Sequence, residues 1–579
     1  MGVNRPADTS GRIRRINGPL VEVDGLPPTV ALADTVEIGS RNLVGEVVHV
    51  SEDRITAQVY ESTAGVRAGE RVRARPWPLS APLGPGLLGR VFDGILRPLD
   101  EAPTWLVPGG QPSRARSMRF APLIEAGAQV GPGTRIGTAV TSTNIEEAVV
   151  VPPGVQGSLD WVSPPGETDW GGSVATVAGR QVPVVQHWPV RTQRPHLERL
   201  RTDVPLITGQ RVLDVLFPVA QGSTAAVVGG FGTGKTVLLQ QIAKWCDADV
   251  IVYVGCGERG NELADTLDEL RQLEDPRTGR MLMERTVIIA NTSNMPVMAR
   301  EASIYTGMTV AEYFRDQGLH AVLIADSTSR WAEAQREFAS RLGQLPAEEG
   351  YPAGLASALA AFYERAGRVR TLSGAEGSVT VVAAVSPPGG DLTEPVTAHT
   401  QRFVRCLWTL DRDLAYGRHY PAVSWRSSFS RDADGLASWY VEQGDPGWQA
   451  RRTRTAALLA QADHLRSVAE LVGEAALPGR ERVVLLTARL VRDGVLRQSA
   501  LDANDAACGT AKQAALFDAA LAVHDAAQRL VDAGRPAAVL EEVDLSRLVQ
   551  AASQVGRDDA AGVARRRDEV LALLTREQD

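Results

Sequence analysis

Residues 224–245, TAAVVGGFGTGKTVLLQQIAKW, constrain the fold more than any other stretch of this chain. An apolar run leads into a glycine-rich loop and a helix-forming segment follows, which is the setting that the pattern G-x-x-x-x-G-K-[ST] requires. The glycines let backbone N–H groups face phosphate oxygens, and the N-terminus of the helix favours anions. The alternative is a glycine-rich loop without a ligand. The predicted nucleotide-binding residues here are Gly229, Gly230, Phe231, Gly232, Thr233, Gly234, Lys235, Thr236 and Val237.

Two side chains of this loop have predicted roles of their own. Lys235 is expected to reach the β and γ phosphates and to act in catalysis, and Thr236 is expected to offer its hydroxyl to Mg²⁺. The chain has only three lysines, Lys235, Lys244 and Lys512, among its 61 basic residues. In such a chain a lysine indicates a place that needs a compact ammonium rather than a planar guanidinium. We attribute Lys244 and Lys512 to chance, so this observation only supports the motif.

Two carboxylates follow apolar runs and complete the predicted chemistry. Asp326 closes the run HAVLIAD and is predicted to hold Mg²⁺ directly or through water, although it could also cap the next helix. Glu258 follows the run VYVGCG and is predicted to orient and deprotonate an attacking water, with Arg259 bracing it or contacting phosphate. The alternative for Glu258 and Arg259 is a solvated ion pair in a loop.

The spacing of apolar residues and the content of Gly and Pro change along the chain, which predicts several domains. Short alternating runs near the N-terminus predict a β-barrel, and a Gly- and Pro-rich stretch predicts an inserted β-rich bulge. Apolar strands that alternate with helices predict a central α/β domain, and 3.6-residue periodicity predicts a helical C-terminal domain whose charged end is a solvated helix. The predicted bounds are 1–80 for the barrel, 81–110 for a connection, 111–187 for the bulge, 188–436 for the phosphate-loop domain and 437–579 for the helical domain.

Charge and composition exclude several classes of protein. The net charge is −8 and basic residues form no block, so we expect no nucleic acid partner. No stretch has the length and apolar character of a signal peptide core or a membrane span. The four cysteines contain no CxxC pair, which argues against a zinc site and a disulfide framework and favours a reducing compartment.

Long motifs add a resemblance to a known family. With the elements above, the segments HWPVR, RVLDVLFPVAQG, IANTSNMPVMAREASIYTG, ADSTSRWAEAQRE, EEGYPAGLASALAAFYERAG, AVSPPGGDLTEPVT and RHYPAVSW resemble the catalytic A subunit of V-type and archaeal-type (V/A) rotary ATPases. The resemblance covers about residues 18–497. The inserted bulge is similar to the extra region of A subunits, which F-type β, V-type B and flagellar export ATPases lack.

The resemblance implies roles for individual residues. Lys235, Thr236 and Asp326 match the phosphate and Mg²⁺ residues, and Glu258 matches the catalytic glutamate, with Arg259 beside it. Arg330 matches the arginine that follows the second nucleotide motif, and Tyr420 falls where the family places an aromatic ring against adenine. The implied cofactor is Mg²⁺, with ATP and ADP as substrates.

The resemblance also implies partners. In the family, A and B subunits alternate in an A3B3 ring, B supplies an arginine finger, and central shaft subunits and a peripheral stalk link the ring to a membrane rotor. This places the chain at the cytoplasmic face of a membrane. We therefore expect the chain alone to hydrolyse ATP slowly. The direction of the reaction and the choice of proton or sodium stay open, and the alternatives are a nucleotide-binding but catalytically weak ring subunit or a homohexameric translocase.

Two departures from the family pattern concern the nucleotide. The segment that carries the second aromatic of the adenine pocket reads Asn504, Asp505 and Ala506 here, so we expect one wall of the base pocket to be missing. Thr233 stands where eukaryotic A subunits have a cysteine, so we expect no thiol switch at the phosphate loop.

Overall fold

The computed structural model describes residues 10–52, 54–99, 108–109, 117–141, 145–275 and 277–576. The polypeptide forms two compact units: Met1–Leu200 with Ala248–Ala383, and Arg201–Asp247 with Ala384–Asp579. The boundary predicted between residues 110 and 111 lies outside the described residues. Within the described ranges, every helix is too short or too polar to cross a membrane.

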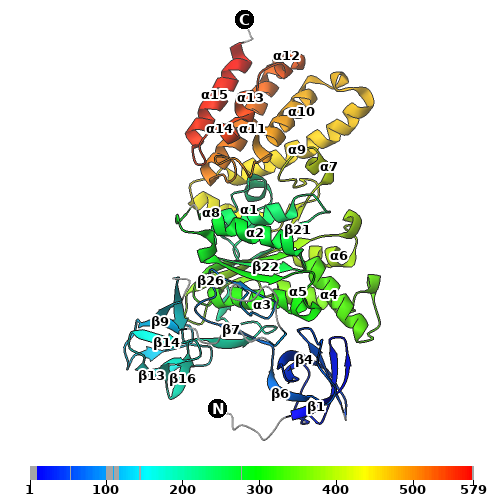
Figure 1. Ribbon diagram of the computed structural model, residues 1–579. Coiled ribbons are helices and arrows are strands. Elements are labelled where there is room, and N and C mark those ends of the chain that lie inside the picture. The colour runs from blue at the N-terminus through cyan, green and yellow to red at the C-terminus, as the bar shows by residue number, and fades with distance from the viewer. Residues whose placement is uncertain are drawn as a thin grey trace. The chain divides into compact units, whose positions relative to one another are not determined.

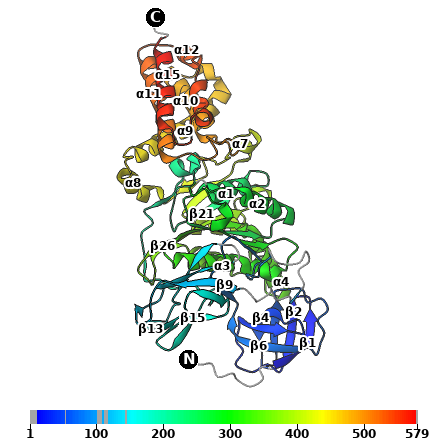
Figure 2. The same cartoon turned by 60° about the vertical axis from the view of Figure 1, so that its left-hand side comes forward.

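The first unit begins with a closed β-barrel, drawn in blue in Figure 2, with strand order β1-β2-β5-β4-β3-β6. Side chains alternate between the barrel interior and its outside, as the period of a strand requires, so that Val21 and Val23 of β2 are buried. The strands are β1 (Ser10–Asn17), β2 (Leu20–Asp24), β3 (Asp34–Ile38), β4 (Leu43–Val50), β5 (Ile55–Val59) and β6 (Arg71–Pro78).

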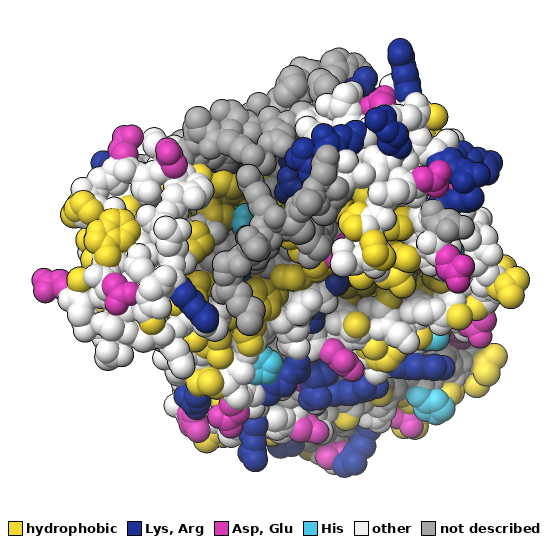
Figure 3. Space-filling model, turned by 90° about the horizontal axis from the view of Figure 1, so that it is seen from below, with side chains coloured by type: hydrophobic (Ala, Val, Ile, Leu, Met, Phe, Trp, Pro, Cys, Tyr) yellow, Lys and Arg dark blue, Asp and Glu magenta, His cyan; other side chains and the backbone are white. Residues whose placement is uncertain are grey.

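The inserted bulge is a sandwich of two four-stranded sheets, ordered β10-β13-β15-β16 and β12-β11-β9-β14. One apolar core lies between them and includes Phe120, Ile136 and Leu159. Acidic and basic side chains lie among hydrophobic ones on the face shown in Figure 3. The strands are β9 (Ser117–Pro122), β10 (Gln129–Val130), β11 (Arg135–Val140), β12 (Glu146–Val150), β13 (Gly157–Val162), β14 (Gly166–Asp169), β15 (Ser173–Val177) and β16 (Arg180–Pro183), and the insertion is closed by the antiparallel pair β7 (Ser80–Leu83) and β17 (Gln186–Pro189).

The rest of the first unit is a parallel sheet covered by helices. Strands β26, β24, β22, β23 and β8 follow one another in parallel, and every residue of β22 is buried, as expected when both faces of a sheet are covered. Helix α3 packs against β22 and β24. The elements are β8 (Val91–Phe92), β22 (Val250–Cys256), α2 (Gly260–Gln272), β23 (Thr286–Asn291), α3 (Val297–Arg315), β24 (His320–Asp326), α4 (Thr328–Arg341), α5 (Leu355–Tyr363) and β26 (Glu376–Val385).

The second unit contains the strand and helix on either side of the glycine-rich loop. Strand β21 runs parallel to β27, and β28 pairs with β27 in the antiparallel direction. The apolar run predicted before the loop is fully buried. These elements are β21 (Thr224–Val228), α1 (Lys235–Trp245), α6 (Pro395–Phe403), β27 (Cys406–Thr409), α7 (Arg412–Tyr416) and β28 (Phe429–Ser430).

A helical domain completes the second unit, with its helices side by side in the yellow to red part of Figure 1. The predicted fold class, a β-barrel, a β-rich bulge, an α/β domain and a helical domain, is confirmed. The charged end is not a solvated helix, because α15 buries Val563, Val570 and Leu574 and packs against α11. The helices are α8 (Ala433–Glu442), α9 (Trp448–Val472), α10 (Gly479–Val491), α11 (Thr510–Asp532), α12 (Ala537–Glu541), α13 (Ser546–Val549), α14 (Ala551–Gln554) and α15 (Ala560–Arg576).

Arg211 is fully buried in the second unit, against the segment that follows α10. Its guanidinium donates to the carbonyls of Val495 (2.5 Å) and Arg497 (2.6 Å) and to Oδ1 of Asp505 (2.6 Å). Oδ2 of Asp505 accepts from the backbone N–H of Ser499 at 2.7 Å. A single buried cation therefore holds the segment 495–505 in shape.

Lys512 is also buried in the second unit. Its contacts contradict the interpretation that this lysine is present by chance. This buried side chain on α11 donates from Nζ to the carbonyls of Asn504 (2.9 Å), Ala552 (2.8 Å) and Val555 (2.9 Å). Burial lowers the pKa of this ammonium, while Cys508 and acidic neighbours counteract the shift. Three N–H donors meet three carbonyls, an arrangement for which a compact ammonium is better suited than a planar guanidinium.

Replacing Arg211 is predicted to destabilise the protein strongly. Arg211→Met leaves Asp505 buried without its cation, and breaking a buried ion pair in this way costs about 3–5 kcal/mol. Urea titration followed by helical circular dichroism measures the loss. The matched control is Arg454→Met, because Arg454 forms a half-exposed pair with Asp525 at 2.6 Å, and this change is expected to cost less than about 1 kcal/mol. Equal losses in the two variants would contradict the role given to Arg211.

Candidate nucleotide site

The phosphate-loop prediction falls on a tight turn between β21 and α1. Gly232 and Gly234 have φ values of 78° and 90°, which an L side chain rarely adopts. Thr233 donates from its hydroxyl to the carbonyl of Gly230 at 2.8 Å, and Nζ of Lys235 donates to the carbonyls of Gly229 (2.7 Å) and Gly230 (2.9 Å). The turn thus places an ammonium and a helix N-terminus at the same loop, which suits an anionic ligand.

The apolar residues of the predicted loop lie outside the core. Phe231 is 89% exposed, and Val237 is 51% exposed on the first turn of α1. Val237 lines a cavity of about 760 Å³ together with Gly232, Thr233 and Gly234. This volume is within the range of small-molecule sites.

Tyr420 lines the same cavity and lies close to the phosphate loop. A Cβ atom added to Gly234 would come within 3.5 Å of Cε1 of Tyr420. The ring is 43% exposed, so it is not a core tyrosine, which was the alternative for an aromatic residue at this position. An exposed aromatic ring beside a phosphate loop can stack on a nucleotide base.

Of the three residues at which a wall of the base pocket was expected to be missing, Asp505 lines the cavity, whereas Asn504 and Ala506 do not. Ala506 is buried and does not line the cavity; its carbonyl accepts hydrogen bonds from Gln210 (3.1 Å) and Gln498 (3.4 Å). The wall in this region consists of residues 499–501 and of side chains from the segment 549–553. The cavity therefore has residues on this side, Asp505 among them, and Tyr420 is the one aromatic residue among the described residues that line it.

Glu258 lies in the loop after β22, in the first unit. The N–H of Gly257 donates to the carbonyl of Asn291 at 2.7 Å, and the N–H of Ser293 donates to the carbonyl of Glu258 at 2.9 Å. These bonds join the loop after β22 to the loop after β23. Gly257 has φ 74°, and a Cβ there would come within 2.7 Å of Cβ of Arg330. The glycine thus permits Arg330 to pack directly against the loop of Glu258.

The two predicted arginines have different surroundings. Arg259 is largely exposed and pairs with Glu262 at 3.6 Å. Arg330 pairs with both carboxylate oxygens of Glu333 at 2.9 Å, and this contact, followed by the charges of Glu333 and Glu258, raises the pKa of its guanidinium against the effect of burial. Arg330 is therefore in the electrostatic field of Glu258.

Asp326 ends β24 and is buried, with 3% of its surface exposed. The hydroxyl of Tyr253 donates to its Oδ2 at 3.3 Å. Burial, with the nearby charges of Asp326 and Glu258, raises the pKa of Tyr253 well above its ordinary value, so the hydroxyl remains a donor. Sequence reasoning missed Tyr253, because it lies within an apolar strand and has the pattern of a core residue.

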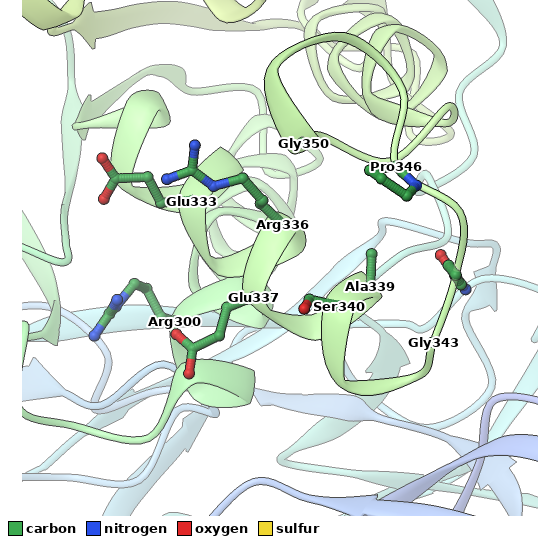
Figure 4. A pocket seen from close by; sticks show the side chains of 10 residues that line it. Arg300, Glu333, Arg336, Glu337, Ala339, Ser340, Gly343, Pro346 and Gly350 are labelled. Atoms are coloured by element: carbon green, nitrogen blue, oxygen red, sulfur yellow. The ribbon is translucent and has the colours of Figure 1, made fainter.

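A second cavity, of about 710 Å³, lies beside α4 in the first unit (Figure 4). Glu333 and Arg336 extend from α4, and the loop with Gly343, Pro346 and Gly350 borders the cavity. Arg300 connects it to the Glu258 loop, because a Cβ at Gly257 would come within 3.2 Å of Cδ of Arg300. Its lining carries both signs of charge.

The structure thus brings the predicted residues together in two groups. The phosphate loop, with Lys235 and Thr236, lies in the second unit with Tyr420, and the first unit contains Glu258, Arg259, Asp326 and Arg330. Among the residues that the structure describes, His, Cys, Asp and Glu side chains form no cluster that could hold a metal ion by themselves.

Comparison with known proteins finds four family models that match parts of the chain. The nucleotide-binding domain of the ATP synthase alpha/beta family matches residues 209–430, and the C-terminal domain of V and A type ATP synthase matches residues 437–540. The beta-barrel domain of the alpha/beta family matches residues 13–75, and its barrel-sandwich domain matches residues 112–191.

Individual relatives agree with these matches. The V-type ATP synthase alpha chain of Anaeromyxobacter sp. (strain K) is 50% identical over 96% of this chain and 97% of its own length. The A subunit of the A-type ATP synthase of Thermococcus sibiricus is 46% identical over 91% of this chain and 92% of its own length. The assembled ATPase EscN of a type III secretion system is 22% identical, with a TM-score of 0.63 over 89% of this chain and 100% of that chain, which shows a shared fold.

Acidic pH is predicted to destabilise the protein through His419, the neighbour of Tyr420. Burial lowers the pKa of this imidazole to about 4, although Asp493 acts in the opposite direction. An unfolded histidine titrates near pH 6.5, so below that pH the unfolded state binds the proton first and stability falls until about pH 4. The loss between pH 7 and pH 5 is about 2 kcal/mol.

Calorimetric Tm values at pH 7 and pH 5 test this prediction. His419→Gln is expected to lose less Tm over this range than the wild type. His464→Gln replaces an exposed histidine of α9 and is expected to keep the wild-type dependence. Parallel curves for the wild type and His419→Gln would show that another group causes the acid sensitivity.

Proposed function

Because this chain belongs to the ATP synthase alpha/beta family, and within it to the V- and A-type branch, we propose that it is the catalytic subunit of a V/A-type rotary ATPase or ATP synthase. It couples ATP hydrolysis or synthesis to ion transport across a membrane. The observation that carries this conclusion is 50% identity to a V-type ATP synthase alpha chain over 96% of the chain. The ion is a proton or sodium.

In this proposal the phosphate loop binds ATP through residues of the second unit. Lys235, whose ammonium already lies on the loop carbonyls, neutralises the β and γ phosphates. The base stacks on Tyr420 within the cavity that begins at Gly232 and Gly234. The phosphate loop and Tyr420 line the same cavity, so one nucleotide can contact both.

Magnesium fits the oxygen donors present. The hydroxyl of Thr236 and the carboxylate of Asp326 would hold the ion, and Mg²⁺ keeps several waters and needs few protein ligands. When bound, the ion supplies positive charge that offsets the charge of the transferring phosphoryl group. Tyr253 orients Asp326 through its hydroxyl.

Glu258 is the proposed base for the attacking water. It accepts the proton of a water that attacks the γ phosphate in line, and Arg330 and Arg259 contribute positive charge nearby. The assignment of Glu258 and Asp326 to the nucleotide held by the phosphate loop rests on their chemistry and on the family. The presence of Lys235, Glu258 and Asp326 together favours a catalytic subunit over a weak, nucleotide-binding one.

The proposal includes a multi-subunit complex. Family membership implies other V/A subunits, and in our proposal B subunits alternate with this chain in an A3B3 ring and supply the arginine finger. The central shaft and peripheral stalk would then link the ring to the membrane rotor, with this chain peripheral to the cytoplasmic face. An arginine finger contributes about 10³–10⁵ in rate, so the isolated chain turns over slowly.

Lys235→Ala and Glu258→Gln test the proposed chemistry in the reconstituted complex. Both are expected to lower the rate of ATP hydrolysis by at least about 10³-fold, since each removes a group that acts on the reacting phosphate or its water. Glu258→Gln keeps its shape and should still bind MgATP, whereas Lys235→Ala should bind it poorly. Coupled-enzyme assays and equilibrium nucleotide binding measure the two effects.

Matched controls come from α1, which begins with Lys235, and from α2, which follows the loop of Glu258. Lys244→Ala on α1 and Glu269→Gln on α2 are expected to leave the rate within about twofold of the wild type, because surface substitutions away from a site have small effects. Wild-type turnover in Glu258→Gln would overturn its role as the base. Full turnover by the isolated chain would contradict the partner's arginine finger.

Tyr253→Phe is predicted to lower kcat about five- to thirtyfold while the fold is retained. The change removes only the hydroxyl that donates to Asp326, and such a hydrogen bond to a charged group is worth about 1–2 kcal/mol. The ATPase rate of the complex measures this effect. Tyr313→Phe, at a buried tyrosine of α3 in the same unit, is the control, and an equal loss there would point to general loosening of the core.

A further inference from the structure

Arg412 is an exposed residue at the start of α7, and its guanidinium lies against the phosphate loop. A Cβ atom added to Gly230 would come within 2.8 Å of Nη2 and 2.9 Å of Nε of this arginine. Such a Cβ atom would overlap the guanidinium, so the contact requires a glycine at position 230. A cation from a distant part of the sequence therefore touches the backbone of the loop that is proposed to bind phosphate.

The same guanidinium contacts a second turn that is rich in glycine. Nη2 of Arg412 donates to the carbonyl of Gly389 at 2.8 Å, and a Cβ atom at Gly390 would come within 2.9 Å of Nη2. Gly389 and Gly390 have φ values of 64° and 83° and belong to the short turn Pro388–Gly390, which follows β26. One planar cation thus joins the phosphate loop to this turn, and all of these residues belong to the second unit.

Backbone bonds fix the position from which Arg412 extends. Asp411 caps α7, since its Oδ1 accepts from two backbone N–H groups of the helix at 2.7 and 3.1 Å. The N–H of Leu410 donates to the carbonyl of Val228 at 2.7 Å, where β21 ends and the phosphate loop begins. The backbone before Arg412 is therefore attached to the same strand end from which the phosphate loop departs.

We propose that Arg412 is a positioning residue for the phosphates, because it holds the phosphate loop against the turn at residues 388–390. This inference rests on the proposed function and deepens it. A phosphate loop binds through its backbone N–H groups, which converge on an anion only while the loop keeps one shape. Glycine gives a loop the greatest conformational freedom, so an outside contact at Gly230 reduces the ordering that phosphate binding would otherwise require.

Binding of MgATP and magnesium tripolyphosphate to the full-length chain tests the proposal. Arg412→Ala is expected to weaken both ligands about tenfold, because both depend on the phosphate loop and the contact that holds it is lost. In the reconstituted complex, KM for MgATP is expected to rise by a similar factor while kcat stays within about threefold, since the loop holds the phosphates before and during the reaction. Isothermal titration calorimetry and steady-state rates measure these effects.

Two glycine variants test the contact itself. Gly390→Ala places a methyl group against the guanidinium and is expected to weaken MgATP as much as Arg412→Ala does. Gly444→Ala is its matched control, because Gly444 also has a left-handed φ, of 88°, and a Cβ there would have no other heavy atom within 4 Å. It should stay within about twofold of the wild type. In an Arg412→Ala background, Gly390→Ala should cause no further weakening, which a double-mutant cycle measures.

Two arginine variants complete the test. Arg402→Ala removes an exposed arginine from the last turn of α6 and should change neither Kd. Arg412→Lys keeps the charge but loses the planar guanidinium, so it is expected to bind both ligands as weakly as Arg412→Ala. Wild-type affinity in Arg412→Lys would show that charge alone is needed and would overturn the positioning role. Equal affinities in the wild type and Arg412→Ala would overturn it as well.

The remaining outcomes separate this inference from the proposed function. A wild-type chain that binds neither MgATP nor tripolyphosphate contradicts the proposed function itself. Weaker MgATP binding with unchanged tripolyphosphate binding in Arg412→Ala would assign the residue to the base and overturn its role at the phosphates. A Tm lower by more than about 5 °C in Arg412→Ala would assign the residue to the stability of the whole fold and would also overturn that role.

Discussion

The buried guanidinium of Arg211 is the contact on which the nucleotide-binding half of this protein depends. It binds two backbone carbonyls and the carboxylate of Asp505 without access to water. A buried cation is tolerated only when its partners are complete, so the segment 495–505 has little freedom to take another path. The wall that faces Tyr420 is part of this segment. The shape of the cavity thus depends on the hydrogen bonds and the ion pair of Arg211 as much as on apolar packing.

Lys512 is a second buried cation that binds backbone carbonyls, and its partners could not be predicted from the sequence. The motif around Lys235 is local, since the carbonyls that its ammonium binds lie 5 and 6 residues away, and its place in a turn between a strand and a helix could be predicted from the sequence. The acceptors of Lys512 lie 8, 40 and 43 residues away, and backbone carbonyls carry no sequence signal. The rarity of lysine supported only the prediction for Lys235, and the fold reveals what Lys512 binds.

The strand edge of the first unit shows a similar limit. Glu258 and Asp326 follow apolar runs, and parallel strands collect their carboxyl ends at one edge, so their placement was predictable. The contact of Tyr253 with Asp326 depends on the register between β22 and β24, in which Gly255 is paired with Asp326. The position of Gly257 against Arg330 likewise requires tertiary structure. The charged composition of α15 concealed its buried residues, which recur at spacings of seven and four along one face of the helix.

The division of labour between the two groups of residues has a kinetic consequence. In the proposed function, Tyr420 contacts a base that takes no part in the reaction, so this contact is equally strong in the bound substrate and in the transition state. Such uniform binding lowers KM and leaves kcat unchanged. In the same proposal, Glu258 and the donors around Asp326 act where charge and protons move, so their contribution is greatest in the transition state and is expressed in kcat. An altered contact with the base can therefore adjust the nucleotide concentration at which the enzyme works, while the chemical step keeps its rate.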